Sequence, residues 1–424
     1  MSRVTATYEI ESPVGVARAA EVLAGEQSTG TFVRLAAETD ALRGRSAARI
    51  EAMEIHGVSD RPALPCRLTG AAYERGAVTI SWPIGTFGTS LPTLMATIAG
   101  NLFELAELSA CRLTGLTLPA DFARAHPGPQ FGAAGTREKM GGHQGPLIGT
   151  IVKPSVGLSP EETGALVKAL AEAGIDFIKD DELQADGPDC PLAARVAAVS
   201  AVLNRHADRT GKRIVYAFNI SGEIDEMRRN LDLLTAHEAT CAMVCLNAVG
   251  LPGLRAVRNH SPHLIHGHRA GWGLVSRSPH VGVGFPVMQK LWRLAGADHL
   301  HVNGLASKFT EEDASVMASA RAVQAPVAEG EPAHIAMPVF SSGQTIWQVG
   351  PSRGLLGNDD FIFCAGGGIL SHPGGTAAGV RALRQAADAA RDGLTLEAAA
   401  AERPELAEAM KAFRNPFGAS AAPN

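Results

Sequence analysis

Residues 174–182 read GIDFIKDDE, an apolar run that opens directly onto four charged residues. The run has the length and the β-branched character of a buried strand. Period-2 alternation would place Lys179 and Asp181 on one face, with Glu182 within reach as the chain turns. Two carboxylates and a lysine would then meet at one strand end, where hard oxygen ligands suit Mg²⁺. The alternative is the acidic first turn of a helix, which the helix dipole favours.

Length and composition bound the class of protein. A chain of 424 residues exceeds one ordinary domain, so we expect two. A net charge of −5 without long runs of one sign argues against nucleic acid and anionic membranes as partners. The six cysteines form no CxxC pair and the first residues lack the apolar core of a signal peptide, so we expect a cytoplasmic protein with reduced cysteines.

The pattern of apolar residues changes along the chain. Residues 1–120 mix strand and helix patterns, which predicts a small ferredoxin-like α+β domain. Residues 121–142 are rich in Ala, Gly and Pro and read as a linker. Residues 143–424 repeat a short apolar strand, a polar or Gly-rich turn and an amphipathic helix, as a (β/α)₈ barrel requires. A doubly wound open sheet is the runner-up, but no GxGxxG fingerprint follows any strand. The eight expected barrel strands lie near residues 147–152, 175–178, 214–218, 242–246, 263–265, 299–302, 337–340 and 361–364.

Side chains that could take part in catalysis or binding follow most of these strands. In a barrel, the carboxyl ends of all strands lie at one mouth. A lone histidine is more often structural than functional, but polar residues after most of the predicted strands together favour a functional site. Lys153 after the first strand is a candidate acid or base, and Arg269 with His301 could hold an anionic group. Gly-rich turns after the last two strands suit a phosphate, because bare N–H groups can approach it closely. This set predicts proton abstraction next to a carbonyl, with Mg²⁺ stabilising the enediolate.

Two motifs resemble the large chain of ribulose-bisphosphate carboxylase and, within it, the RuBisCO-like proteins. They are GTIVKP at residues 149–154 and DFIKDDE at residues 176–182, and the resemblance runs over essentially the whole chain. In that family the lysine matching Lys179 is carbamylated by CO₂, and the carbamate binds Mg²⁺ together with the carboxylates matching Asp181 and Glu182. A carbamate would explain a lysine among acids, because it turns a cation into an oxygen ligand.

The resemblance also implies roles for other positions and a small phosphorylated substrate. Residues 26–32 and Asn101 match segments that cross a dimer into the partner's barrel, which implies a homodimer with shared active sites, or a higher oligomer built from it. The implied catalytic residues are Lys153, Lys179, His268 and Lys308. The implied substrate contacts are Glu26, Thr31, Phe32, Asn101, Arg269, His301, Ser341, Gly343, Gly366 and Gly367.

Departures from the carboxylase pattern decide the expected reaction. Ser155 stands where carboxylases have a lysine and Ile151 where they have a threonine, while Phe32 and Ser342 replace a tryptophan and a glycine. The segment 302–308 also differs from the carboxylase Gly-rich version. With so many changed contacts, true CO₂ fixation on ribulose bisphosphate is not expected.

The retained residues point to another reaction of the same type. Lys308 and His301 fit a substrate that bears both phosphate and carboxylate. Among the reactions of RuBisCO-like proteins, the resemblance therefore implies carbon–carbon cleavage of 3-oxo-isoapionate 4-phosphate, by decarboxylation or by transcarboxylation and hydrolysis. The alternatives are 5-methylthioribulose-1-phosphate isomerase and 2,3-diketo-5-methylthiopentyl-1-phosphate enolase of methionine salvage. A non-catalytic member is a further class, against which the intact Lys153 and Lys179 argue.

Overall fold

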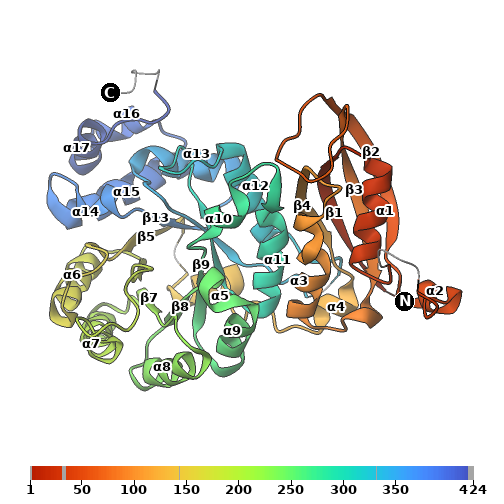
Figure 1. Cartoon of the computed structure of the whole chain (residues 1–424). Helices are drawn as coiled ribbons and strands as arrows, with labels where there is room; N and C mark the ends of the chain where they lie inside the picture. Colours follow the sequence, from red (N-terminus) through yellow and green to blue (C-terminus); the bar gives the residue numbers. More distant parts are fainter. Residues whose placement is uncertain (1, 31–34, 143, 331, 419–424) are drawn as a thin grey trace. The chain divides into compact units, whose positions relative to one another are not determined.

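The computed structural model describes residues 2–30, 35–142, 144–330 and 332–418 (Figure 1). In this described part, none of the helices combines the length and apolar character needed to cross a bilayer. The chain forms two units. The first comprises Met1–Gly128, Gly271–Ala295 and Pro326–His334, and the second comprises Pro129–Ala270, Gly296–Ala325 and Ile335–Asn424.

The first unit is built on a sheet with strand order β10-β4-β1-β3-β2. Central β1 alternates buried and partly exposed residues, which is why its sequence pattern predicted a strand. Tyr8 on β1 donates its hydroxyl to the carbonyl oxygen of Ile98 at 2.7 Å, which ties helix α3 to the sheet. The strands are β1 (Arg3–Ser12), β2 (Arg49–Ser59), β3 (Tyr73–Pro83), β4 (Ala110–Thr117) and β10 (Val281–Val283). The helices are α1 (Val16–Glu26), α2 (Asp40–Ser46), α3 (Leu91–Ala99), α4 (Ala120–Arg124), α10 (Trp272–Ser276) and α11 (Phe285–Ala295), with 3₁₀ turns η1 (Ile84–Thr86) and η2 (Asn101–Glu104).

One segment predicted as part of the barrel belongs to the first unit instead. Helix α11 lies within residues 143–424, the range predicted as barrel, but β10 just before it pairs in parallel with β4. Lys290 on α11 also donates to the carbonyl oxygen of Leu116 at 2.5 Å. β10 has only three residues, too few for an alternation to be visible in the sequence. The stretch 121–142, predicted as a linker, contains the short helix α5 and ends in the second unit.

The second unit is a closed parallel barrel, with strand order β11-β12-β13-β5-β6-β7-β8-β9. This confirms the prediction of a (β/α)₈ fold together with a smaller α+β domain, and closure of the barrel excludes the open sheet. The barrel strands are β5 (Leu147–Ile151), β6 (Phe177–Lys179), β7 (Val215–Asn219), β8 (Cys241–Cys245), β9 (Leu264–His268), β11 (His299–Asn303), β12 (Met337–Phe340) and β13 (Ile362–Cys364). The helices are α5 (Gly132–Lys139), α6 (Pro160–Glu172), α7 (Leu192–Thr210), α8 (Ile224–Ala236), α9 (Leu246–His260), α12 (Asp313–Gln324), α13 (Ile346–Leu356), α14 (Gly367–Leu370), α15 (Gly375–Arg391), α16 (Leu396–Ala400) and α17 (Pro404–Ala412).

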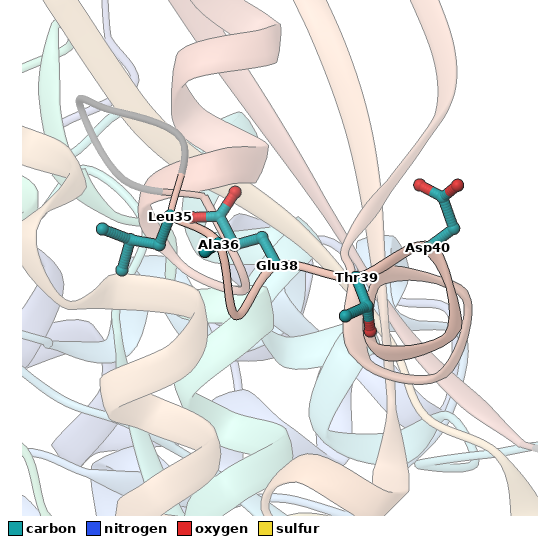
Figure 2. Close-up of a pocket in the computed structure, with 5 residues that line it drawn as sticks. All are labelled: Leu35, Ala36, Glu38, Thr39 and Asp40. Atoms are coloured by element: carbon teal, nitrogen blue, oxygen red, sulfur yellow. The ribbon is translucent and has the colours of Figure 1, made fainter.

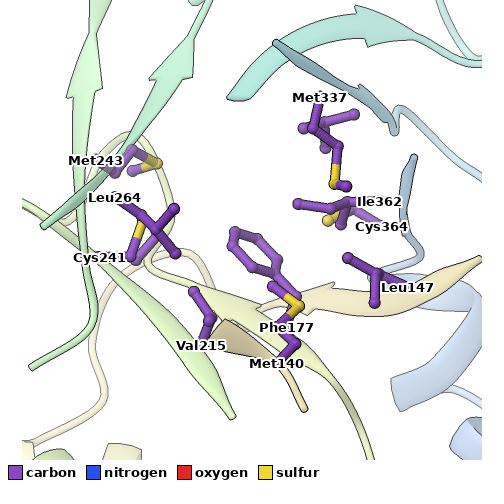
Figure 3. Close-up of a cluster of buried hydrophobic side chains, with 12 residues drawn as sticks. Met140, Leu147, Phe177, Val215, Cys241, Met243, Leu264, Met337, Ile362 and Cys364 are labelled. Atoms are coloured by element: carbon purple, nitrogen blue, oxygen red, sulfur yellow. The ribbon is translucent and has the colours of Figure 1, made fainter. Parts of the chain in front are cut away.

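Buried apolar side chains form a cluster in the barrel interior (Figure 3). Phe177 on β6 lies among residues from the other strands, and it is fully buried. Met140, directly after α5, joins the same cluster, and Phe131 packs against it. Helix α5 therefore closes the barrel at the amino ends of its strands, opposite the mouth.

A buried carboxylate fastens this closed end. Asp298, directly before β11, accepts hydrogen bonds from the backbone N–H groups of Phe131 at 2.7 Å and Gly132 at 3.0 Å. It also accepts from Ile265 N–H at 2.9 Å and from the Arg258 guanidinium at 3.0 Å. The charge of Asp298 is thus stabilised by donors from β9, α9 and the start of α5, and it is shielded from water.

We expect Asp298→Asn to destabilise the barrel. The change leaves the buried Arg258 guanidinium without its counter-charge, and breaking a buried pair in this way costs roughly 3–5 kcal/mol. Urea unfolding should show this loss, whereas the control Asp208→Asn, on an exposed site of α7, should change the free energy of unfolding by no more than about 0.5 kcal/mol. Equal stabilities of the two variants would contradict the assigned role of Asp298.

Candidate active site

The turn after β6 brings three predicted residues together. Lys179 is buried, and its Nζ donates to the carbonyl oxygen of Asp180 at 2.7 Å. The same Nζ lies 3.7 Å from Oε2 of Glu182. Nε2 of His268, on β9, lies 3.5 Å from that oxygen. Glu182 is therefore placed between a buried lysine and an imidazole at the carboxyl ends of two strands.

Lys153 holds the other carboxylate of the turn. Its Nζ donates to Oδ2 of Asp181 at 2.6 Å and to Oγ of Ser155 at 2.7 Å. Burial by itself would raise the pKa of Asp181, but the hydrogen bonds from Lys153 and from Leu183 N–H outweigh it and lower the pKa below its ordinary value. Asp181 is therefore ionised at neutral pH. Ser155, one of the departures from the carboxylase pattern, directly restrains the ammonium group of Lys153.

Asp180 faces away from this pair and organises the turn from behind. Its carboxylate accepts from Tyr216 Oη at 2.5 Å, from Arg195 Nε at 3.2 Å and from Asn219 N–H at 2.9 Å. Burial raises the pKa of Asp180 in spite of the Arg195 charge. All of these side chains are buried.

Asn219 connects this network to Asp181 and Glu182, the two candidate metal ligands of the turn. Its Nδ2 donates to the carbonyl oxygens of Asp181 at 3.3 Å and Glu182 at 3.2 Å. The sequence reasoning missed Asn219, although a polar residue at the end of the third barrel strand was a usable signal. Arg195 lies within α7 and carries no such signal.

The acidic turn fits a divalent cation only with help from Lys179. Among the described residues, no three His, Cys, Asp or Glu side chains are grouped to hold a metal ion. Asp181 and Glu182 supply hard oxygen donors, the type that Mg²⁺ prefers, but the Nζ of a lysine lies beside each of them. Lys179 lies within 3.7 Å of Glu182 and is 1% exposed, so a carboxyl group carried on its Nζ would be in position to complete the set.

The predicted anion contact at Arg269 already has a partner from the chain itself. Nη2 of Arg269 donates to Oε2 of Glu311 at 2.5 Å, and Nδ2 of Asn303 donates to the same oxygen at 2.6 Å. The sequence reasoning missed Glu311, which lies in the loop after β11. In the same loop, Nζ of the exposed Lys308 lies 5.3 Å from the ring centroid of Phe309.

His266 and His268 occupy positions different from those expected, whereas His299 and His301 lie in their predicted strand. The predicted fifth barrel strand was expected to end at residue 265, but β9 continues to His268 because it pairs with β8 as far as Cys245. His266 and His268 therefore lie within the strand and not after it. Nε2 of His266 lies 2.7 Å from Nε2 of His301, whose Nδ1 lies 2.9 Å from Oγ of Ser341. Burial, and then neighbouring positive groups, hold the pKa of His266, His268 and His301 well below the ordinary value.

The glycines predicted to contact phosphate lie at the ends of the last two strands. Ser342 and Gly343 both have positive φ, 75° and 86°, and glycine accepts this conformation without cost. Gly366 precedes the short helix α14, which begins at Gly367. A Cβ at Gly367 would meet no atom within 4 Å, so open space lies beside this backbone. Their contact with a phosphate remains a prediction.

Two of the residues predicted to reach a partner subunit adjoin each other in the first unit. Nδ2 of Asn101 lies 3.5 Å from Oε1 of Glu26. Thr31 and Phe32 lie outside the described residues. A shallow hollow is formed by the segment that follows them in the sequence. It is lined by residues 35, 36 and 38–40 and contains none of the predicted site residues (Figure 2).

The chain is similar to characterised proteins over almost its full length. The family model of the ribulose bisphosphate carboxylase large chain catalytic domain matches residues 132–413, and that of the N-terminal domain matches residues 2–122. The chain is 54% identical to the 3-oxo-isoapionate-4-phosphate transcarboxylase/hydrolase of Xanthobacter autotrophicus, over 97% of this chain and 99% of that one. It is 41% identical to the 3-oxo-isoapionate-4-phosphate decarboxylase of Rhizobium etli, over 98% and 100%. The crystal structure of a rubisco-like protein from Burkholderia fungorum matches with a TM-score of 0.92 and 41% identity, over 97% and 100%.

We predict that His299 makes the barrel sensitive to acid. Burial lowers its pKa from 6.5 to about 3, so between these values the unfolded chain binds a proton that the folded chain rejects. Stability is therefore complete above pH 6.5 and falls as the pH drops toward 3. In His299→Gln the slope of the unfolding free energy against pH should fall by up to about 1.4 kcal/mol per pH unit in this range. Denaturant titrations at several pH values measure the slope, and unchanged slopes would refute a neutral, buried His299.

Proposed function

The chain belongs to the ribulose bisphosphate carboxylase large-chain family, and from that membership we propose that it is a RuBisCO-like enzyme that cleaves a carbon–carbon bond of 3-oxo-isoapionate 4-phosphate. The observation that carries the proposal is the 54% identity, across nearly both whole chains, to an enzyme named for this substrate. The higher identity to the transcarboxylase/hydrolase than to the decarboxylase, 54% against 41%, favours the hydrolytic route.

The acidic turn would hold the cofactor of this reaction. Lys179 as a carbamate, with Asp181 and Glu182, would bind Mg²⁺, which would stabilise negative charge on a ketone oxygen of the substrate. Asn219 would keep both carboxylates in place through their backbone carbonyl groups.

The chain's own groups would move the proton. In decarboxylation of a 3-oxo acid, the bond between the carboxyl carbon and C2 breaks, CO₂ leaves, and the ketone takes up the electron pair as an enolate, so a proton must then reach C2. In transcarboxylation and hydrolysis the CO₂ would rejoin the enediolate instead, and water would enter when the product is cleaved in two. The Lys153 ammonium, restrained between Asp181 and Ser155, is the donor we assign, and the His268 imidazole beside Glu182 is the group that receives or returns a proton on the other side.

The end of the site that contains Arg269, which we call the distal end, fits a substrate with a single phosphate. Glu311 neutralises the charge of Arg269, so this end carries no excess positive charge for a second phosphate dianion. The phosphate would bind instead to the backbone N–H groups around Gly343, Gly366 and Gly367. Lys308 would contact the carboxyl-bearing end of the substrate, whereas His301 would act through Ser341, to which its Nδ1 is bonded.

The active form would be a homodimer with shared sites. Glu26 and Asn101, which adjoin each other in the first unit, would enter the partner's barrel together. Because neither residue has a catalytic neighbour among the described residues of its own unit, a shared site would give this pair a function.

The direct test is turnover of 3-oxo-isoapionate 4-phosphate by the purified chain with Mg²⁺ and bicarbonate. Hydrolytic cleavage should consume substrate with all of its carbon retained in two organic products. Release of one CO₂ per substrate would identify decarboxylation instead. Lack of turnover, together with activity on methylthioribulose phosphate or the diketo phosphate, would overturn the proposal in favour of a salvage isomerase or enolase.

Lys179→Ala should reduce this turnover by at least about 1,000-fold, because the metal set loses a ligand and charge stabilisation in the transition state is lost. Lys168→Ala, on the exposed face of α6, is the matched control and should stay within about twofold of the parent. Circular dichroism should show both variants folded. Full activity of the folded Lys179 variant would rule out the carbamate.

Glu311→Gln should open the distal site to a second anion. The change removes the counter-charge of Arg269, so a sugar bisphosphate such as ribulose 1,5-bisphosphate should inhibit the variant about tenfold more tightly, which corresponds to about 1.4 kcal/mol. Glu312→Gln, at the exposed neighbouring position, is the control and should leave the inhibition constant unchanged. Equal inhibition of both variants would show that Glu311 does not exclude a second phosphate.

A further inference from the structure

A row of hydrogen-bonded side chains runs through the barrel from its closed end to its mouth. We call it the histidine row, and it consists of Thr136, His299, His266, His301 and Ser341. Thr136 lies on α5 at the closed end, and Ser341 directly follows β12 at the mouth. All five side chains are buried, with at most 5% exposure.

The contacts along the histidine row are consecutive. Oγ1 of Thr136 lies 2.9 Å from Nε2 of His299, and Nδ1 of His299 lies 3.4 Å from Nδ1 of His266. Nε2 of His266 lies 2.7 Å from Nε2 of His301, and Nδ1 of His301 lies 2.9 Å from Oγ of Ser341. Every ring nitrogen in the row therefore has one partner within the row.

The surroundings keep the three rings neutral. The ring of Phe177, which belongs to the apolar cluster of Figure 3, lies 5.0 Å from the His266 ring and 5.9 Å from the His299 ring between centroids. A charged imidazole beside this apolar layer would lose its hydration. A neutral imidazole carries one N–H, so each ring donates with one nitrogen and accepts with the other.

Thr136 sets the direction at the closed end. Its hydroxyl group donates to the carbonyl oxygen of Gly132, one turn earlier in α5. A carbonyl oxygen can only accept, so the single hydroxyl proton of Thr136 is committed there. Toward His299, Thr136 can then only accept, and Nε2 of His299 must carry the hydrogen.

The direction then passes from ring to ring. Because Nε2 of His299 carries the hydrogen, its Nδ1 accepts from Nδ1–H of His266. Nε2 of His266 in turn accepts from Nε2–H of His301. Nδ1 of His301 is then left as an acceptor, and the hydroxyl group of Ser341 donates to it.

We propose that Thr136, His299 and His266 are positioning residues that fix His301 as its Nε2–H tautomer and so make Ser341 a hydrogen-bond acceptor toward the substrate. Ser341 commits its only proton to His301, and it offers lone pairs alone to the mouth. It therefore selects a substrate hydroxyl group at this position over a carbonyl or carboxylate oxygen. This selection rests on the proposed function, but the tautomer does not.

A reversed row would give the opposite preference. If Nδ1 of His301 carried the hydrogen, Ser341 would accept from it and its own proton would turn toward the mouth or toward Ser342, whose Oγ lies 3.4 Å away. Ser342 already donates to Oδ1 of Asn303 at 3.1 Å, so it could accept that proton. The direction of the hydrogen bonds at His301 and Ser341 therefore depends on Thr136, which lies at the opposite end of the barrel.

The test compares Thr136→Val with Thr136→Ser by ¹⁵N NMR of histidine-labelled protein. In the parent and in Thr136→Ser, Nδ1 of His301 should show the shift of an unprotonated nitrogen and Nε2 that of a protonated one. In Thr136→Val, which cannot accept from His299, a second set of signals with the opposite tautomer should appear. Thr163→Val is the matched control, because Thr163 is a buried helix residue that makes the same bond, to the carbonyl of Ser159, on α6.

The NMR experiment needs no substrate, so its outcome is independent of the proposed reaction. An Nδ1–H tautomer of His301 in the parent, or an unaltered His301 in folded Thr136→Val, would overturn the proposal. With substrate, Thr136→Val should raise KM about tenfold, the equivalent of one hydrogen bond, while Thr136→Ser and Thr163→Val should not. A drop in stability with unchanged tautomer and KM would show that Thr136 is merely structural.

Discussion

The buried carboxylate of Asp298 is the interaction on which the barrel and its site both depend. It binds Arg258 from α9, the N–H of Ile265 in β9, and the N–H groups of Phe131 and Gly132 at the start of α5. A charge at 0% exposure is tolerated because four donors satisfy it. The same contact holds α5 under the strands, and α5 presents the hydroxyl group from which the histidine row takes its direction. The position of α5 at the closed end of the barrel thus influences hydrogen bonding at the mouth.

At the mouth, adjacent acidic residues have opposite tasks because their surroundings differ. Asp180 is fully enclosed by Arg195, Tyr216 and Asn219 and serves as a support. Asp181, its neighbour, has its pKa lowered through Lys153 and faces the site as a carboxylate. In an extended chain, successive side chains point to opposite sides, so the carboxylates of Asp180 and Asp181 face in opposite directions. One motif of three acids therefore contains both the candidate ligands and the residue that holds them.

The charges around the site are mostly paired within the chain, and this pairing bears on specificity. Lys153 is bound to Asp181 and to Ser155, and Arg269 is bound to Glu311. A site of this kind does not attract anions by excess charge, and it must recognise its substrate through donors and acceptors of fixed direction. One residue that departs from the carboxylase pattern, Ser155, takes part in these pairings, while the acidic turn itself is retained.

The repeat of short apolar runs, polar turns and amphipathic helices was enough to predict the eight barrel strands, and the DFIKDDE motif was enough to predict the family, since both signals are local in the chain. The sequence did not reveal that β10 and α11 join the first unit, that β9 extends through His268, or that Glu311 pairs with Arg269. These features depend on partners far apart in the chain, and residue type does not specify them. Which nitrogen of His301 carries its hydrogen is the clearest case, because every histidine has the same two nitrogens and only the neighbours brought by folding distinguish them.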